Sequence, residues 1–313
     1  MNWSRFLRAR LARLVVVVAA LLGFTFLMLH LAPGDPARLV AGLDADETVV
    51  AQTRAELGLD RPMYEQFGSY VAGAVQGDLG RSFSTREEVS SIIAEKIGPT
   101  MQLAGLAMAV IVLVGIPLGI AGAVASRGGR RGVEVAFSSV TGALAAIPQY
   151  LVATFLAFAF AVTWQLFPVA GNATLAAAVL PALAIALRPS ASIARLVRIR
   201  TLEVLESPYI RTARSKRLRR RTFYLRHVLP NAVTTVLAIS GMIFAGLIGG
   251  AVIVELVFAR PGLGTSLVDA VLMGDYPVVQ GIVLLLGVLV VVINAVVDVL
   301  NGLVDPRTVE TAR

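Results

Sequence analysis

Polar and ionisable side chains inside apolar stretches are the groups of this sequence that could carry chemistry, because such groups are costly in apolar surroundings. The chain has five residues of this kind: Gln102, Gln149, Glu255, Asn294 and Asp298. Side chains of these types line polar paths, form gates or pair with one another. We expect no catalytic residue among them, since no nucleophile, base and orienting group stand together in a recognisable pattern.

Motifs for other chemistry are missing from the sequence. There is no Gly-x4-Gly-Lys-Ser/Thr phosphate loop and no Gly-x-Ser-x-Gly elbow. The chain has no cysteine, and its two histidines, His30 and His227, are far apart. We therefore expect no metal site and no cofactor in this chain. The energy for any work must come from a partner or from a membrane gradient.

The composition is that of a protein with several membrane spans. Hydrophobic residues make up 57% of the 313 residues and charged residues 15%, whereas soluble domains carry about 25% charged residues. The net charge of +8 would also suit a nucleic-acid binder. However, the basic residues lie in blocks between apolar runs, which favours membrane topology and no nucleic acid partner.

The apolar runs predict an all-α fold with six transmembrane helices. The predicted spans are residues 14–30, 100–125, 133–162, 173–188, 231–254 and 278–303. The first run is longer than a signal-peptide core and lacks an A-x-A site, which favours an uncleaved span over a signal peptide. Pro148 should kink the third span, and Arg188-Pro189 should mark where the fourth span nears the cytoplasmic surface. The basic blocks predict that both termini are cytoplasmic.

The predicted domains follow from these spans. They are a first segment (1–31), an external subdomain (32–98), a five-helix core (99–303) and a cytoplasmic tail (304–313). Residues 32–98 hold eleven acidic and six basic residues, which favours an external location after a span with a basic N-terminal side. Within this subdomain we expect helices at 46–57 and 63–75 and a short amphipathic helix at 87–97. Residues 255–277 should form an external or re-entrant loop.

The segment 195–230 interrupts the apolar background with a long basic stretch. Twelve lysines and arginines stand between Arg188 and His227. Leu202, Leu205, Tyr209 and Ala213 form an apolar stripe with helical spacing. Ser207-Pro208 is a helix start, so we expect one helix to end near Glu206, a second to span 208–216, and a third to begin near Thr222. Such a layout suits docking to a partner protein; the alternative is contact with anionic lipid headgroups.

Several stretches together carry a family resemblance. The segment TLEVLESPYIRTARSKRL with YLRHVLPNA resembles the cytoplasmic loop of ABC-importer permeases, and in particular the first permease of the dipeptide, oligopeptide and nickel importer family. Further stretches agree in the expected order along nearly the whole chain. They are APGDP (32–36), LGLDRP (57–62), GDLGRSFSTR (77–86), PTMQL (99–103), IPQY (147–150), VIVELVFARPGLG (252–264), DYPVVQG (275–281) and DP (305–306).

The resemblance implies a multi-pass permease of the bacterial plasma membrane with type I ABC importer architecture. Its implied partners are a second, related permease, two ATPase subunits that hold ATP and Mg, an external substrate-binding protein and a peptide substrate. The short helix of the loop would be the coupling helix that sits in a cleft of one ATPase. The implied ATPase-coupling residues are Glu206, Tyr209, Ile210, Thr212, Ala213, Lys216 and Arg217.

Arg217 departs from the family pattern, which has glycine at this position. A glycine there would end a helix in the left-handed conformation, and a non-glycine residue in that conformation costs roughly 1 kcal/mol. Either the turn is remodelled, or Arg217 contacts the partner or lipid.

The remaining candidates belong to the translocation pathway and to the external loop. Gln102, Gln149 and Glu255 are pathway candidates, with an interfacial position as the alternative for Glu255. For Asn294 and Asp298, pairing with an arginine of segment 195–230 is favoured over substrate contact. The candidate binding-protein or gate residues are Arg260, Pro261, Gly262, Asp275 and Tyr276, and ordinary structural turns are their alternative.

The sequence leaves three classes of function open. An ATP-driven importer of di- or oligopeptides leads, and nickel or another small cargo is possible within the same family. A self-contained secondary transporter would not need the basic segment. An integral membrane enzyme is disfavoured because no catalytic constellation is present.

Overall fold

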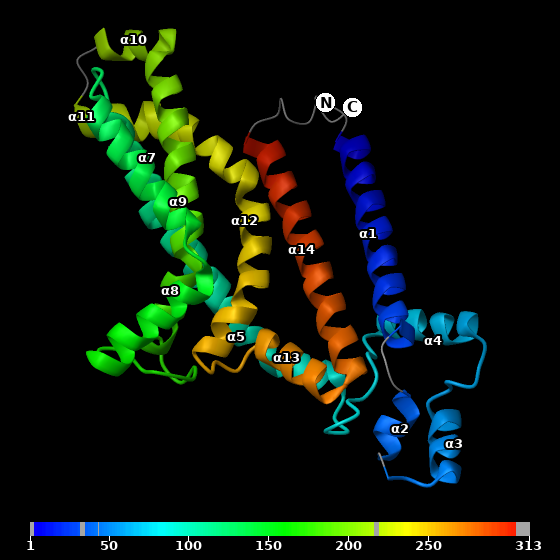
Figure 1. The fold of residues 1–313 in the computed structure, drawn as a ribbon. Helices are drawn as coiled ribbons and strands as arrows, with labels where there is room; N and C mark the ends of the chain where they lie inside the picture. Colours follow the sequence, from blue (N-terminus) through cyan, green and yellow to red (C-terminus); the bar gives the residue numbers. More distant parts are fainter. Residues whose placement is uncertain (1–2, 32–34, 43, 216–218, 305–313) are drawn as a thin grey trace. The chain divides into compact units, whose positions relative to one another are not determined.

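The computed structural model describes residues 3–31, 35–42, 44–215 and 219–304 of the chain. These residues are predominantly helical (Figure 1), with a single antiparallel β-bridge between Arg81 and Glu88 in the described part. They fall into two compact units, described one at a time below. Unit 1 comprises residues 1–6, 101–260 and 293–313, and unit 2 comprises residues 7–100 and 261–292.

Five described helices are long and apolar enough to cross a membrane, and a bent pair brings the number to six. The five spans are Arg10–Met28, Val89–Ala125, Ala176–Glu206, Ile239–Val257 and Tyr276–Gly302. The bent pair joins α7 (Arg131–Ala146) to the stretch formed by α8 (Gln149–Leu156) and η2 (Ala157–Thr163). The prediction of an all-α membrane fold is thus confirmed.

The bend between α7 and α8 measures 89°, and α8 turns sharply away from α7 in Figure 1. Pro148 lies at the break and has no amide hydrogen for the ladder, so the helix ends at Ala146 and restarts at Gln149. The predicted kink is present. Its size, however, divides the third span into two helices.

Unit 1 is built around α9 (Ala176–Glu206), which packs against α6 (Ile116–Ala125), α7, α8 and α12 (Leu229–Val257). Alanine is the commonest residue on the inward side of α9, which lets neighbouring helices approach closely. The predicted helix end near Glu206 is confirmed, whereas the expected approach to the cytoplasmic surface near Arg188-Pro189 stays a prediction. The helix continues through Pro189 to Glu206, because its neighbours pack around it and compensate for the lost backbone hydrogen bond.

The segment after α9 contains short helices. Helix α10 (Pro208–Ser215) crosses the end of α9 (Figure 1), and α11 (Arg220–Phe223) and η3 (Tyr224–Val228) lead into α12. The predicted helix from Pro208 is therefore present. The next helix begins at Arg220 rather than at Thr222.

Unit 2 contains α1 (Trp3–Leu31) from residue 7 onward and a set of shorter helices. These are α2 (Pro36–Ala41), α3 (Glu47–Glu56), α4 (Met63–Gln76) and α13 (Leu263–Met273). The first part of α5 (Val89–Val110) and the first part of α14 (Tyr276–Val304) complete it. The predicted helix at 63–75 matches α4, which ends at Gly77 with a φ of 83°.

One expectation for this unit is wrong. The short amphipathic helix expected at 87–97 is instead the beginning of α5, which runs on through Pro99 and η1 (Ile111–Gly115) into α6. The loop predicted at 255–277 contains α13, an eleven-residue helix, and whether this segment is external or re-entrant stays a prediction.

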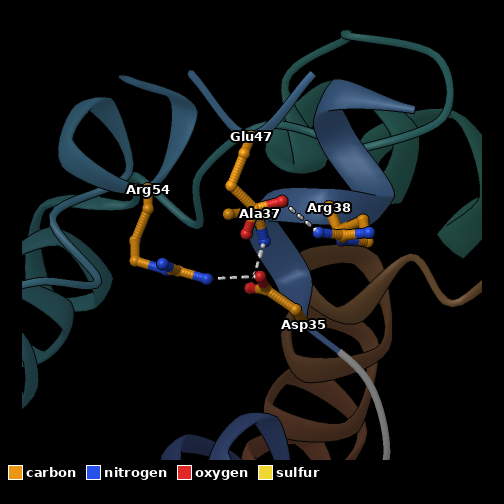
Figure 2. Close-up of polar contacts among 5 residues, drawn as sticks. All are labelled: Asp35, Ala37, Arg38, Glu47 and Arg54. Atoms are coloured by element: carbon orange, nitrogen blue, oxygen red, sulfur yellow. Dashed lines mark hydrogen bonds and ion pairs between the residues drawn. The ribbon is translucent and has the colours of Figure 1, made fainter. Parts of the chain in front are cut away.

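Ion pairs and caps organise the residues after α1 (Figure 2). Asp35 accepts a hydrogen bond from the Ala37 amide at the start of α2 and pairs with Arg54 of α3, while Arg38 pairs with Glu47. These side chains are largely exposed, so each pair contributes on the order of 0–1 kcal/mol. They fix the orientation of α2 against α3 more than they add stability.

Candidate functional sites

Helix α10 begins where α9 stops, at a one-residue break. Ser207 has extended backbone angles (φ −64°, ψ 148°), and its carbonyl accepts the amide of Ile210. The Ser207 hydroxyl donates back to the carbonyl oxygen of Val204 in α9. The predicted break at Ser207-Pro208 is present, but the serine side chain closes the preceding helix instead of capping α10.

The inward side of α10 belongs to a small apolar core formed by Leu205, Ile210, Ala213, Phe223 and Val228. Ile210 is fully buried and Ala213 is 7% exposed. These two residues were expected at the ATPase contact. Their burial within this chain places them in the packing of α10 on α9 and η3, and a role at the ATPase contact stays a prediction.

The outward side of α10 and the end of α9 present Glu206, Tyr209 and Thr212, which are all exposed. Tyr209 is 45% exposed, and its hydroxyl lies 3.5 Å from the carbonyl oxygen of His227. The expected apolar stripe therefore does not form one surface, because Tyr209 faces outward while Leu205 and Ala213 face inward. The candidates Lys216 and Arg217 lie outside the described residues.

In unit 1, a buried polar cluster joins three candidates that the sequence placed in two different groups. Arg260 is fully buried just after α12, and its Nη2 donates to Oε1 of Gln102 in α5 at 2.7 Å. Its Nη1 lies 3.4 Å from the carbonyl oxygen of Gly171. Arg260 is therefore an internal strut, and its role as a binding-protein or gate residue stays a prediction.

Glu255 supplies the charge that balances Arg260. Its side chain is fully buried, and its backbone carbonyl accepts the Arg260 amide at 2.8 Å. Burial lowers the pKa of the Arg260 guanidinium, and the Glu255 carboxylate opposes that change. Gln102 keeps an exposed surface, so it is the member of this cluster that can also meet a solute.

The other pathway candidates contact neighbouring helices. Gln149, the first residue of α8, donates to the carbonyl oxygen of Gly250 in α12 at 3.0 Å. A Cβ on Gly241 would lie 2.7 Å from Oδ1 of Asn294, so these two residues mark a close approach of α12 and α14. Asp298 is partly buried one turn further along α14. Its pairing with an arginine of segment 195–230 stays a prediction.

In unit 2, Asp275 is enclosed by a loop that the sequence did not connect with it. Its carboxylate accepts hydrogen bonds from the hydroxyls of Ser82 and Ser84 and from the amides of Phe83 and Ser84. Asp275 is 2% exposed. Burial tends to raise the pKa of this carboxyl, and the four hydrogen bonds outweigh that effect and lower its pKa.

Hydrogen bonds also hold the N-terminal end of α13, as those of Asp275 hold the residues just after its C-terminal end. The amide of Leu263 donates to the Thr100 hydroxyl at 2.9 Å, and the amide of Gly262 donates to the Thr265 hydroxyl. Pro261 and Tyr276 are partly buried and Gly262 is buried. Of the five external-loop candidates, three are buried and two are partly buried in this chain, and their contact with a binding protein stays a prediction.

Sequence reasoning missed Ser82, Ser84 and Thr100 as partners of this loop. The serines lie in the stretch GDLGRSFSTR, which was singled out without a role. Runs of serine and threonine between glycines commonly bind backbone and carboxylate groups, and this was the available signal. The sequence alone did not show which carboxylate they bind.

Comparison with known proteins places this architecture in a family. Residues 115–310 match the family described as binding-protein-dependent transport system inner membrane component, and residues 3–104 match the N-terminal region of such membrane components. The chain belongs to this family of transport permeases. The resemblance expected from the sequence is thereby confirmed.

Named relatives cover almost the whole chain. A putative peptide transport system permease protein of Brucella suis is 40% identical over 306 residues, covering 95% of this chain and 96% of the relative. A glutathione transport system permease protein of Shigella flexneri is 38% identical over 299 residues, with the same coverage of both chains.

A solved structure agrees with the fold. A chain of the MetNI methionine ABC transporter, in an inward-facing conformation, superimposes with a TM-score of 0.58 at 18% identity. The match covers 68% of this chain and 96% of that chain. This similarity supports the helical permease architecture and carries no information on substrate.

Proposed function

We propose that this chain is one of two permease subunits of an ATP-driven importer of di- or oligopeptides in the bacterial plasma membrane. A second, related permease would complete the translocation pathway, and an external binding protein would deliver the peptide. Two ATPase subunits would hold ATP and Mg²⁺ and hydrolyse the ATP. Family membership and relatives named for peptide and glutathione transport support this proposal.

The packing of α10 is the observation that supports the coupling role. Its inner residues, Ile210 and Ala213, pack into an apolar core with α9 and η3, while Tyr209 and Thr212 stay exposed. A short helix with one side fixed and the other side free suits insertion into a groove of a partner. Movement of the ATPases would then reach α9 through this packed core.

The same proposal sets the orientation and the remaining contacts. The termini and α10 lie on the cytoplasmic side, as the basic blocks suggest, and basic side chains there also meet lipid headgroups. Residues 32–98 and 255–277 lie outside and receive the binding protein. Gln102, Gln149, Glu255, Asn294 and Asp298 remain the pathway candidates, with Gln102 favoured for solute contact by its exposure.

The proposal is tested by reconstituting this chain with the second permease, the ATPases and the binding protein in liposomes. Uptake of a labelled di- or tripeptide should require both ATP and the binding protein. Uptake by the isolated chain in ATP-free liposomes would point to a secondary transporter and overturn the proposal. ATP-dependent uptake of Ni²⁺ without peptide uptake would overturn the substrate assignment.

A further inference from the structure

An arginine is buried in the longest helix of unit 1, eight residues before that helix ends. Arg198 of α9 is 7% exposed. Burying a charge is costly unless the charge is paired and hydrogen-bonded. The pathway and coupling candidates discussed above do not include it.

Three helices meet at this guanidinium. Nη2 of Arg198 lies 3.0 Å from Oε1 of Glu134, in the first turn of α7, and 3.2 Å from Oγ of Ser126, which directly follows α6. Its Cζ lies 5.7 Å from the centre of the Phe137 ring, within the range of a cation–π contact. One side chain of α9 thus contacts both ends of the α6–α7 connection.

Glycine makes this arrangement possible. A Cβ on Gly122 would lie 2.4 Å from Cε2 of Phe137, so the ring fits against α6 only where that residue has no side chain. The Ser126 hydroxyl, which accepts from Arg198, donates to the Gly122 carbonyl at 2.8 Å. A Cβ on Gly119 would lie 2.6 Å from the Ala194 carbonyl oxygen, which brings α6 and α9 equally close.

The contacts of Arg198 do not satisfy it completely. Its Nε is buried without a hydrogen-bond partner among the described residues. The Glu134 side chain is 56% exposed, so water screens its ion pair with Arg198 and the pair adds little stability. A buried arginine that is incompletely satisfied indicates that the position serves something besides stability.

Resting on the coupling role proposed above, we infer that Arg198 is a positioning residue that makes the α6–α7 connection move together with α9. Apolar helices packed side by side can slide past one another. The ion pair with Glu134 and the hydrogen bond to Ser126 resist sliding, because both contacts exist only at the short distances that the present positions of the helices give. Displacement of α10 therefore passes through α9 to α6 and α7 as a single body.

The test compares Glu134→Gln with Glu203→Gln in the reconstituted complex. The first variant removes the charge facing Arg198 and keeps the side-chain shape. The second removes an ion pair with Arg200 on the same α9. Both glutamates are 56% exposed, whereas the Arg200 side chain is 45% exposed and the Arg198 side chain 9%, so the two pairs differ in the burial of the arginine. Assembly with the ATPases, ATP hydrolysis and peptide transported per ATP are measured for each.

The inference predicts that Glu134→Gln assembles and hydrolyses ATP while transport per ATP falls about tenfold, the size of a typical coupling between sites. Glu203→Gln should keep the wild-type ratio. An unchanged ratio in Glu134→Gln overturns the inference. If Glu134→Gln does not assemble, Ser126→Ala, which removes one hydroxyl, decides by the same ratio. If the wild-type complex itself shows no ATP-dependent uptake, the proposed function fails, and this outcome is distinct from a failure of the Arg198 inference.

Discussion

Arg260 and Gln102 are 158 positions apart in the sequence, and their side chains share a 2.7 Å hydrogen bond. Because Arg260 is fully buried beside Glu255, removing the guanidinium leaves a buried carboxylate without its balancing charge. We predict that Arg260→Met lowers the free energy of unfolding by about 3–5 kcal/mol. Gln102→Leu should cost about 1–3 kcal/mol, since it removes one acceptor. Thermal unfolding of the purified chain in detergent measures both.

A double variant separates charge balance from packing at this site. Arg260→Met combined with Glu255→Met removes both charges and should recover part of the stability lost in Arg260→Met alone. If the double variant is less stable than wild type by the full sum of the losses in Arg260→Met and Glu255→Met, the two charges do not interact.

Asp275 predicts a pH dependence of stability. Its folded pKa lies below its unfolded value of about 3.9. A carboxyl with a depressed pKa contributes stability that is fully present above the unfolded pKa and is lost as the pH falls through the folded pKa. Asp275→Asn should therefore be less stable than wild type at neutral pH, by about 1–3 kcal/mol, and the two unfolding curves should converge in acid.

Asp269→Asn is the matched control for this experiment. Asp269 lies on the same helix, α13, and is exposed. This variant should follow the wild-type stability at every pH. A constant gap between wild type and Asp275→Asn down to the lowest pH would show that the carboxylate charge has no part in holding the 82–84 loop.

The two faces of α10 predict opposite effects of truncation. Ile210→Ala opens a cavity in the core with Leu205 and Phe223 and should cost about 2–5 kcal/mol of local stability. Tyr209→Ala removes an exposed ring and should leave stability within about 0.5 kcal/mol while weakening association with the ATPase. Hydrogen exchange of the isolated chain and co-purification with the ATPase report the two effects. Equal exchange rates in both variants would refute the assignment of inner and outer faces.

The close contact between Gly122 and the Phe137 ring predicts a steric effect of adding a side chain at position 122, which a second substitution should relieve. Gly122→Ala places a methyl group against the Phe137 ring and should destabilise unit 1 by about 1–3 kcal/mol. Adding Phe137→Leu should restore part of this loss. Gly142→Ala in α7 is the control, because a Cβ there meets nothing within 4 Å, and it should be neutral or stabilising. Similar melting temperatures for Gly122→Ala and Gly142→Ala would contradict the close α6–α7 contact.

Local signals in the sequence were sufficient for much of the fold. Ser207-Pro208 within the basic segment predicted α10, and the apolar runs predicted the spans. Both kinds of element depend on residues that are neighbours in the sequence. Pro148 predicted a kink but not an 89° break, because the size of a bend is decided by the helices that pack on either side. Pro189 showed the reverse case, in which packing carried α9 straight through a residue that usually interrupts helices.

Contacts between distant residues were beyond such reasoning. Ser82 and Asp275 are separated by 193 positions and Ser126 and Arg198 by 72, and no local period links either pair. The sequence marked Glu255, Arg260 and Gln102 as notable because each is polar in an apolar setting. Only the fold shows that these three side chains meet. Likewise, only the burial of Ile210 and Ala213 shows that they lie on the other face of α10 from Tyr209.

The central claim is that the outer face of α10 is where this permease meets its ATPase. The chain has no cysteine, so Tyr209→Cys gives a unique attachment point for a maleimide photo-crosslinker, and Ile210→Cys is the buried control. We predict that Tyr209→Cys crosslinks to the ATPase subunit in the assembled complex and is protected from labelling by it, whereas Ile210→Cys does neither. Labelling of Tyr209→Cys that is the same with and without the ATPase, together with no crosslink, would contradict the claim.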